Sequence, residues 1–263
     1  MNVNDKTIWI TGASSGIGRA LAVNLSRRGV RLILSARSAE RLEGCRQACT
    51  HPDRHVVLPL DLTDPASLEE ASRQALEKYG PIDILINNGG VSQRSLVVDT
   101  CLEVDRRIME VNFFGAVALT KLVLPSMVSR KFGHIVVISS VIGKFGTPFR
   151  SVYAASKHAL HGFFESLRAE LWEDGIRVTM ICPGFVRTNI SVNALKGDGS
   201  TLGIMDAGQA VGMDPEICAE KIARAVEAER NEVFIGGKEK LGVYLQRFVP
   251  DLFALIIRNT KVK

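Results

Sequence analysis

Aromatic residues, cysteines and long apolar runs are all scarce in this sequence. Only 6% of the 263 residues are aromatic, and the five cysteines are irregularly spaced without a CxxC pair. That spacing does not fit the usual zinc patterns, so we expect no metal site. An odd number of thiols, with no secretory signal at the N-terminus, predicts a reducing, cytoplasmic location. No run of about 18 apolar residues is present, so no transmembrane helix is expected.

Clustered charge is also lacking. The formal net charge is +5 at pH 7, but Lys and Arg are spread along the chain, which argues against a nucleic-acid surface. A mildly basic surface attracts small anionic ligands instead. The apolar content of 46% is ordinary for a globular protein. We therefore expect a partner that is a small molecule rather than a nucleic acid.

A regular alternation of short apolar strands with amphipathic helices is present. Such alternation predicts an α/β fold with a doubly wound parallel sheet and helices on both faces, the Rossmann fold. We expect one catalytic domain over residues 1–263, with about seven strands. The expected strands are residues 7–11, 31–36, 55–62, 82–88, 134–140, 177–184 and 232–237.

Two segments depart from this alternation. Residues 188–213 are rich in Gly, Asn and Asp, and a long loop in a compact domain is usually functional, so we expect a substrate lid there. The lid carries apolar side chains that suit a hydrophobic alcohol or ketone: Ile190, Val192, Leu195, Leu202, Ile204 and Met205. Four residues are candidates for the opposite wall of the substrate pocket: Ser92, Gln93, Gly146 and Phe149.

The second segment is the C-terminal tail, residues 239–263. It combines helical apolar spacing with a basic end at Arg258, Lys261 and Lys263. The tail could cover the substrate pocket, pack on a partner subunit, or lie in a membrane interface. The first two alternatives require only protein contacts, and we expect the tail to pack on protein.

A glycine-rich turn, "TGASSGIG", follows the first strand and opens the first helix. Gly12, Gly16 and Gly18 permit a tight turn and let a pyrophosphate approach the free N–H groups of the helix. At the end of the second strand, Arg37 stands where an acidic residue would bind the ribose 2′-hydroxyl of NAD. The missing acid and the guanidinium favour NADP(H) over NAD(H). Asp61 could contact the adenine or cap a helix.

The segment "YAASK" places Tyr153 and Lys157 at positions i and i+4, on one face of an expected helix. A phenol has a pKa near 10 in water, and a neighbouring ammonium would favour the phenolate. His158 and His161 flank the pair. We expect both histidines to lie off the Tyr153–Lys157 face and to be structural.

The motifs taken together resemble the short-chain dehydrogenase/reductase family over about residues 5–237. The resemblance rests on "TGASSGIG", "DLTD", "NNGG", Asn112, "SS", "YAASK" and "PG", which occur in the order and at the spacing of the family. The run "NNGGVSQR" is similar to one branch of dehydrogenases/reductases. Gly89 replaces the more common alanine, and the smaller residue fits the same turn.

This resemblance implies a catalytic set of Asn112, Ser140, Tyr153 and Lys157. Tyr153 would act as general acid and base, Ser140 would bind the carbonyl oxygen, and Asn112 would hold a water in a proton relay. The resemblance also implies dinucleotide contacts throughout the cofactor motifs: Gly12, Ser14, Ser15, Gly16, Ile17, Gly18, Arg37, Asp61, Leu62, Asn88, Gly89, Tyr153, Lys157, Pro183, Gly184, Val186 and Thr188.

The implied function is an NADP(H)-dependent oxidoreductase that transfers a hydride between the nicotinamide and a carbonyl or secondary alcohol. Two alternatives are a dinucleotide-binding regulator without turnover and a ketoacyl thioester reductase. Asp174 disfavours the reductase, because reductases of that type tend to carry a basic residue there for an acidic carrier. Apolar residues on the helix of Tyr153, together with family habit, predict a homodimer or homotetramer.

Overall fold

The computed structural model describes residues 1–259, so the basic tail residues Lys261 and Lys263 lie outside the described residues. Its centre is a seven-stranded sheet in the order β3-β2-β1-β4-β5-β6-β7, and each pair of neighbouring strands is parallel. This confirms the fold predicted from the sequence. The strands are β1 (Thr7–Thr11), β2 (Arg31–Ser35), β3 (Val56–Val57), β4 (Ile84–Asn87), β5 (Gly133–Ile138), β6 (Ile176–Pro183) and β7 (Glu232–Ile235).

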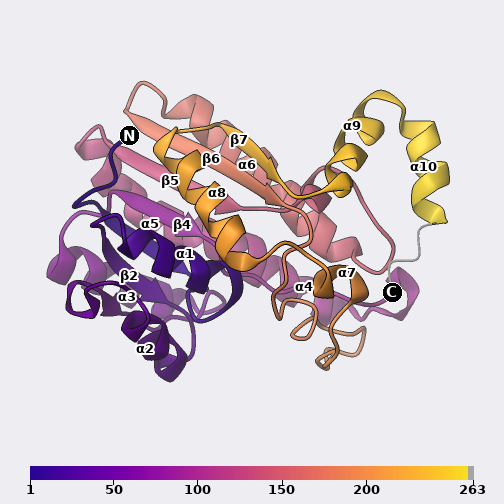
Figure 1. Cartoon of the computed structure of the whole chain (residues 1–263), viewed down its shortest axis with the longest axis horizontal. Coiled ribbons are helices and arrows are strands. Elements are labelled where there is room, and N and C mark those ends of the chain that lie inside the picture. Colours follow the sequence, from indigo (N-terminus) through magenta and orange to yellow (C-terminus); the bar gives the residue numbers. More distant parts are fainter. Residues whose placement is uncertain (260–263) are drawn as a thin grey trace.

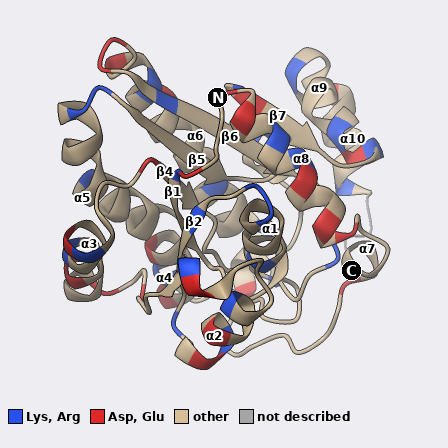
Figure 2. Ribbon diagram, turned by 60° about the vertical axis from the view of Figure 1, so that its left-hand side comes forward, with Lys and Arg blue, Asp and Glu red and all other residues tan. Residues whose placement is uncertain are grey.

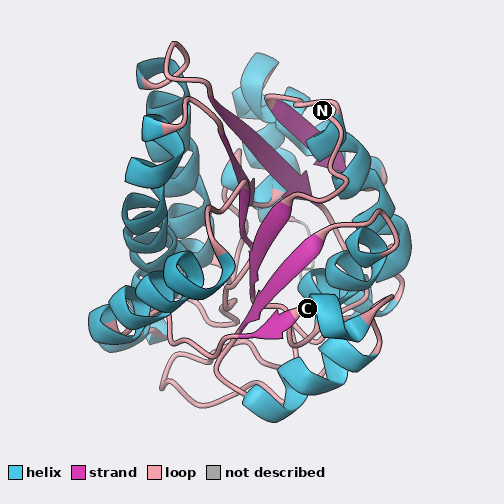
Figure 3. Cartoon of the chain, turned by 90° about the vertical axis from the view of Figure 1, so that its left-hand side faces the viewer, coloured by secondary structure: helices cyan, strands magenta, loops and turns pink. Residues whose placement is uncertain are grey.

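Helices cover both faces of the sheet, as the edge-on view in Figure 3 shows. One layer holds α1 (Gly16–Ser26), α2 (Ala39–Gln47) and α8 (Pro215–Glu227). The other holds α3 (Pro65–Tyr79), α5 (Gly115–Ser129) and α6 (Ser151–Glu170). Alternate strand residues enter the two layers: Ile8 and Ile10 pack on the first, and Trp9 on the second. This double burial explains why the strands are apolar throughout rather than alternating with polar residues.

The helix starts follow local chemistry. Ser38 accepts a hydrogen bond from the Arg41 N–H and caps α2, and Asp64 caps α3 through the Ala66 N–H. Asp61 is therefore not the cap of α3. At the other end of that helix, Gly80 has φ 76°, a left-handed conformation that glycine adopts without steric cost.

The expected helical stretch near residues 101–131 consists of three parts. A π-helical turn, η3 (Glu110–Phe114), joins α4 (Leu102–Met109) to α5. The 28-residue run Leu102–Ser129 is long and apolar enough to cross a membrane by length and composition. It lies, however, in a helical layer of the fold, where α5 packs against α3 and α4 packs against α6. Within the fold, 39% of the apolar window of this run is buried.

The lid and the tail lie at the carboxyl ends of the strands. The lid forms an irregular loop that contains a short helix, α7 (Ala207–Ala210). After the turn η5 (Lys238–Lys240), the tail forms α9 (Leu241–Phe248) and α10 (Pro250–Arg258), which Figure 1 shows as a yellow arm at one end of the molecule. Three further short helical turns lie in connections: η1 (Pro52–Arg54), η2 (Val97–Asp99) and η4 (Val141–Gly143).

Candidate active site

A cavity of about 1200 Å³ opens at the carboxyl ends of the strands and extends from the glycine turn to the C-terminal tail. The chain order reverses between β1 and β4, because β2 and β3 lie to one side of β1 and the later strands to the other. Ligands of open α/β sheets bind at such a switch point. The topology therefore places the cavity where a dinucleotide is expected.

The glycine turn is shaped for close approach to the backbone. Gly12 and Gly16 have φ of 66° and 54°. A Cβ on Gly12 would lie 2.8 Å from Asn88 Nδ2, so no larger residue fits without a shift. The same Asn88 amide donates to the carbonyl oxygens of Thr11 and Gly12, at 2.9 and 3.2 Å, and holds the turn against β4. The N-terminus of α1 behind this turn can bind a phosphate.

The sequence-predicted dinucleotide contacts line the cavity with one exception, Gly18. A Cβ on Gly18 would lie 2.3 Å from the Gly12 carbonyl oxygen. Gly18 therefore packs behind the turn, where it permits close packing of α1 rather than contact with a ligand. Thr188 returns to the turn from the far side, because a Cβ on Gly16 would lie 3.2 Å from the Thr188 methyl group.

Arg37 lies at the end of the cavity that follows β2, together with Arg41. The side chain of Arg37 is exposed, and no hydrogen bond or ion pair engages it within residues 1–259. Asp61 lines the same end and accepts hydrogen bonds from the N–H and hydroxyl of Thr63. Burial raises the pKa of Asp61, but these hydrogen bonds and nearby Arg37 bring it below its usual value. A free guanidinium here fits a phosphate.

At the other end of the glycine turn, Ser140, Tyr153 and Lys157 meet on the cavity wall. Ser140 follows β5 and begins η4, where its hydroxyl accepts from the Ile142 N–H and donates to the Pro183 carbonyl. Tyr153 and Lys157 come from adjacent turns of α6, and the Lys157 Nζ lies 5.7 Å from the centre of the Tyr153 ring. The Lys157 ammonium donates to the Ile138 carbonyl at 2.9 Å.

Burial dominates the ionisation of this pair. Desolvation raises the pKa of Tyr153, while Ser140, Arg94 and Arg150 act in the opposite direction. Burial also lowers the pKa of Lys157 to about 8. The cations that favour the Tyr153 phenolate in the protein are thus the two arginines. From the sequence, this effect was expected of the Lys157 ammonium.

Asn112 lies in the π-helical turn, 1% exposed, and is not on the cavity wall. Its amide forms a closed pair with Val91, accepting from the Val91 N–H and donating to the Val91 carbonyl, at 2.8 and 2.9 Å. It also donates to Ser156 on α6. The side chain therefore ties α6 to the segment after β4. A π-helical turn often marks a functional site, because it shifts the backbone hydrogen bonds out of α-helical register.

A buried ionic cluster that was not predicted from the sequence lies on the substrate side of Tyr153. Asp206 of the lid pairs with both Arg94 and Arg150, and the three side chains are 9%, 8% and 4% exposed. Arg94 donates from Nε and Nη2 to one Asp206 oxygen, and Arg150 reaches the same oxygen at 3.1 Å. One sequence feature could have indicated this cluster: Arg150 stands at the N-cap of α6, three residues before Tyr153.

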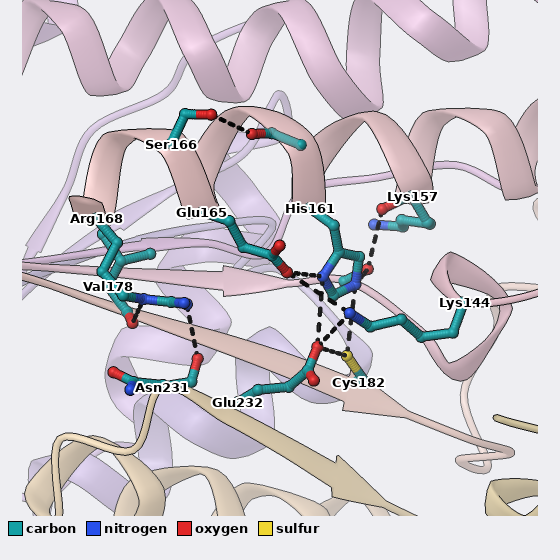
Figure 4. A network of polar contacts seen from close by, with 12 residues as sticks. Lys144, Lys157, His161, Glu165, Ser166, Arg168, Val178, Cys182, Asn231 and Glu232 are labelled. Carbon is teal, nitrogen blue, oxygen red and sulfur yellow. Dashed lines mark hydrogen bonds and ion pairs between the residues drawn. The ribbon is translucent and has the colours of Figure 1, made fainter. Parts of the chain in front are cut away.

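Behind Lys157, a second polar network surrounds His161 (Figure 4). The Ser139 hydroxyl contacts both the Lys157 carbonyl and His161 Nε2, at 3.3 and 3.1 Å. His161 follows Lys157 by one helical turn, so the expectation that it lies off the Tyr153–Lys157 face is wrong. It does not line the cavity, and a structural role fits its contacts.

The ligand atoms of His161, Cys182 and Glu232 lie within 4.8 Å of one another, an arrangement that could hold a metal ion. The Lys144 ammonium pairs with Glu232 at 2.7 Å, however, and with Glu165 at 3.6 Å (Figure 4). Burial raises the pKa of the Cys182 thiol, and a thiol is a poor metal ligand. The Lys144 ammonium, rather than a metal ion, therefore supplies the positive charge that balances the Glu165 and Glu232 carboxylates.

The substrate wall differs in part from the prediction. Ser92, Ile190 and Leu195 line the cavity, but Gln93, Gly146 and Phe149 do not. Gln93 is fully buried, and its amide bonds the Ser95, Thr100 and Ser151 hydroxyls and the Val152 N–H. Several tail residues complete the wall instead: Leu241, Gly242, Leu245, Phe253, Ile256 and Ile257.

Comparison with known proteins identifies the family. Residues 6–198 match the family model described as short chain dehydrogenase. The "Dehydrogenase/reductase SDR family protein 7-like" of Anopheles gambiae is 44% identical over 271 residues, covering 100% of this chain and 85% of the relative. The chain therefore belongs to the short-chain dehydrogenase/reductase family of oxidoreductases, whose fold binds nicotinamide dinucleotides.

Two solved structures agree with this assignment. A short-chain dehydrogenase from Streptomyces avermitilis is 30% identical, with a TM-score of 0.82, and 97% of this chain and 96% of that chain are covered. An alcohol dehydrogenase from Thermococcus sibiricus, complexed with 5-hydroxy-NADP, is 26% identical with a TM-score of 0.77. In that comparison, 90% of this chain and 98% of the other are covered.

Proposed function

We propose that this protein is an NADP(H)-dependent oxidoreductase that interconverts the carbonyl and the secondary alcohol of a hydrophobic small molecule. The observation that carries the proposal is the convergence of Ser140, Tyr153 and Lys157 on one cavity, with the glycine turn and the free Arg37 at its other end. A regulator without turnover would not require the three polar groups together.

Bound NADPH would supply the hydride to the carbonyl carbon. In the protein, Tyr153 provides the proton to the carbonyl oxygen, and the Ser140 hydroxyl donates a hydrogen bond to the negative charge that develops there. Arg94 and Arg150 favour the phenolate that remains after proton transfer, and Lys157 is held beside Tyr153 by its hydrogen bond to the Ile138 carbonyl. The apolar residues of the lid and tail exclude water from the reacting atoms.

The cofactor preference is supported by the exposed, unpaired guanidinium of Arg37 and by the absence of an acidic residue directly after β2. The glycine turn and the α1 N-terminus would hold the pyrophosphate, and Arg37 the 2′-phosphate. The alcohol dehydrogenase that shares the fold was crystallised with an NADP derivative. One charge-assisted contact is worth about 1.5–3 kcal/mol, which predicts roughly 10-fold or greater preference for NADPH over NADH.

Fluorescence titration of NADPH and NADH, followed by assays of NADPH oxidation against a panel of ketones and aldehydes, tests the proposal. Arg37→Asp is expected to reverse the cofactor preference. Arg224→Asp, on the exposed face of α8, serves as a control for the same change of two charge units. Equal affinities of the wild type for the two cofactors would refute the NADP(H) assignment, and no turnover with any carbonyl would refute the catalytic one.

A further inference from the structure

The cluster of Arg94, Arg150 and Asp206 carries an unbalanced charge. Two guanidiniums and one carboxylate leave one excess positive charge, and all three side chains are at most 9% exposed. Among the described residues, Asp206 is the only carboxylate in ion-pairing distance of either arginine. An excess charge in a buried position is costly unless a further group of opposite sign is bound.

The two arginines are not equally saturated. Arg94 donates to Asp206 and, through Nη1, to the Ser92 hydroxyl and the Gln93 carbonyl, at 2.7 and 2.6 Å. Arg150 donates only to Asp206 within residues 1–259, through one nitrogen. A guanidinium carries five N–H donors, so Arg150 retains donors without a protein acceptor. Both arginines line the cavity beside Tyr153.

The backbone around Arg150 adds to the positive potential. Arg150 stands at the N-cap of the 20-residue helix α6, whose first turn has no acidic residue. The positive end of a helix dipole normally attracts acidic residues and repels cations. The preceding residue, Phe149, has φ 65°, a left-handed conformation that is strained for a side chain with a Cβ. The fold thus places the Arg150 guanidinium at the positive end of α6 and directly after the strained residue Phe149, although both features are unfavourable.

We propose that Arg150, supported by Arg94, forms a subsite for an anionic group of the substrate, a carboxylate or a phosphate ester, beside the carbonyl that Tyr153 protonates. The proposal rests on the proposed function and narrows its substrate class to ketones, or the matching alcohols, that carry an acidic group as well as an apolar part. Asp206 orients the two guanidiniums from the lid and leaves the Arg150 donors directed to the ligand.

The test compares straight-chain keto acids of medium length with their methyl esters, in which the negative charge alone is removed. The NADPH-loaded wild type is expected to show kcat/KM about 10-fold or more higher for the acids, the effect of one charge-assisted contact. A keto phosphate monoester of the same length shows whether a carboxylate or a phosphate fits better. Equal kcat/KM for acids and esters, with no gain for the phosphate, would overturn the subsite and leave the oxidoreductase assignment intact.

Substitution separates a binding role from a structural one. Arg150→Met keeps the apolar stem and is expected to bring the acid-to-ester ratio of kcat/KM close to one, because the acid loses more activity than the ester, while the affinity for NADPH is preserved. Arg150→Lys is expected to restore part of the preference, and Arg224→Met, an equal change in charge at a 73% exposed site, to leave it unchanged. A parallel loss on acid and ester would mean that Arg150 only holds the lid, and would overturn the proposal.

Turnover is not required for the last comparison. If no carbonyl compound is reduced, the proposed function fails, and calorimetric titration of the NADPH complex with a medium-chain carboxylate and its methyl ester still tests the subsite. The wild type is expected to bind the carboxylate more tightly, and Arg150→Met to bind both alike. Indistinguishable binding of the two ligands by the wild type would refute the inference independently of the proposed function.

Discussion

Tyr153 stands in an environment that both opposes and assists its ionisation. Burial raises its pKa, and the Ser140 hydroxyl and two arginines act against burial. Tyr153→Phe removes only the hydroxyl, so we expect unchanged folding and NADPH binding. Removal of a general acid and base is expected to lower kcat by about 100-fold or more. Steady-state kinetics with thermal unfolding as the folding control measures both, and a Tyr153→Phe enzyme of full activity would exclude the proton-transfer role.

Lys157 gives a second prediction, in the pH dependence of stability. Its pKa is lowered from 10.5 to about 8 in the folded protein. Below pH 8 the folded state bears the whole cost of a buried ammonium. Between pH 8 and 10.5 the folded state has lost the proton that the unfolded state still holds, so the stability contributed by this residue rises with pH.

The measurement is the free energy of unfolding of the wild type and of Lys157→Met, by chemical denaturation from pH 7 to pH 10. The difference between them, in favour of the variant, is expected to be largest at pH 7 and to shrink as the pH rises. Lys121→Met, an exposed position on α5, controls for the loss of a positive charge. A pH-independent difference for Lys157→Met would show that burial does not depress the pKa of this lysine.

At the scale of elements, local chemistry was readable from the sequence and tertiary chemistry was not. The glycine turn, the Ser38 and Asp64 caps and the Tyr153–Lys157 pair depend on residues within a few positions of one another. The partners of Asp206 lie 112 and 56 positions away in the chain, so no periodicity shows their contact. The π-helical turn is likewise hidden, because its sequence has the same apolar spacing as the α-helices that flank it.

The inner face of the α9–α10 arm packs against the cavity of its own chain. Phe253 of α10 is 5% exposed and packs edge-to-face on Phe145, with ring centres 5.1 Å apart. Both residues line the cavity. The first of the three alternatives, a tail that covers the pocket, therefore describes the inner face of the α9–α10 arm.

This contact makes Phe253→Ala a test of the role of the tail. Loss of a buried phenylalanine costs about 3–5 kcal/mol in a core, and here the loss is expected to release the arm. KM for an apolar ketone should rise several-fold, while the affinity for NADPH should stay unchanged. Phe248→Ala, on the same arm but 76% exposed, should change neither value. Similar substrate KM values for the two variants would show that the arm does not form the substrate site.

At the scale of the whole molecule, charge and apolar surface are distributed differently. Acidic and basic residues alternate over α2, α3 and α8 without forming one basic face (Figure 2). Exposed apolar residues are concentrated in two places, near η2 and α4 and on the outer face of the tail: Leu96, Val97, Val98, Leu102, Tyr244, Phe248, Leu252 and Leu255. Concentrated apolar surface of this kind is typical of protein or membrane contacts.

The helix of Tyr153 supplies less free apolar surface than the sequence indicated. Val152, Phe164 and Leu167 are buried within the chain, and Phe163 packs edge-to-face on Phe113 and Phe164. Trp172, 47% exposed, is covered on one face by the Arg177 guanidinium at 3.7 Å. Phe114, which is 50% exposed, packs on Phe113 beside α6 and is a second exposed aromatic residue near this helix.

We predict that the protein is a homodimer or homotetramer whose contact includes Phe114, since members of this family often form oligomers. An aromatic side chain at the centre of an interface contributes about 2 kcal/mol or more, so Phe114→Asp should weaken association by roughly 30-fold or more. Light scattering over a range of concentrations measures the change, and Phe248→Asp on the tail is the matched variant. Dissociation by Phe248→Asp alone would place the contact on the α9–α10 arm. A wild type that is monomeric at micromolar concentration would refute the prediction. If that monomer bound to anionic vesicles and Phe248→Asp abolished the binding, the outer face of the arm would be assigned to a membrane surface.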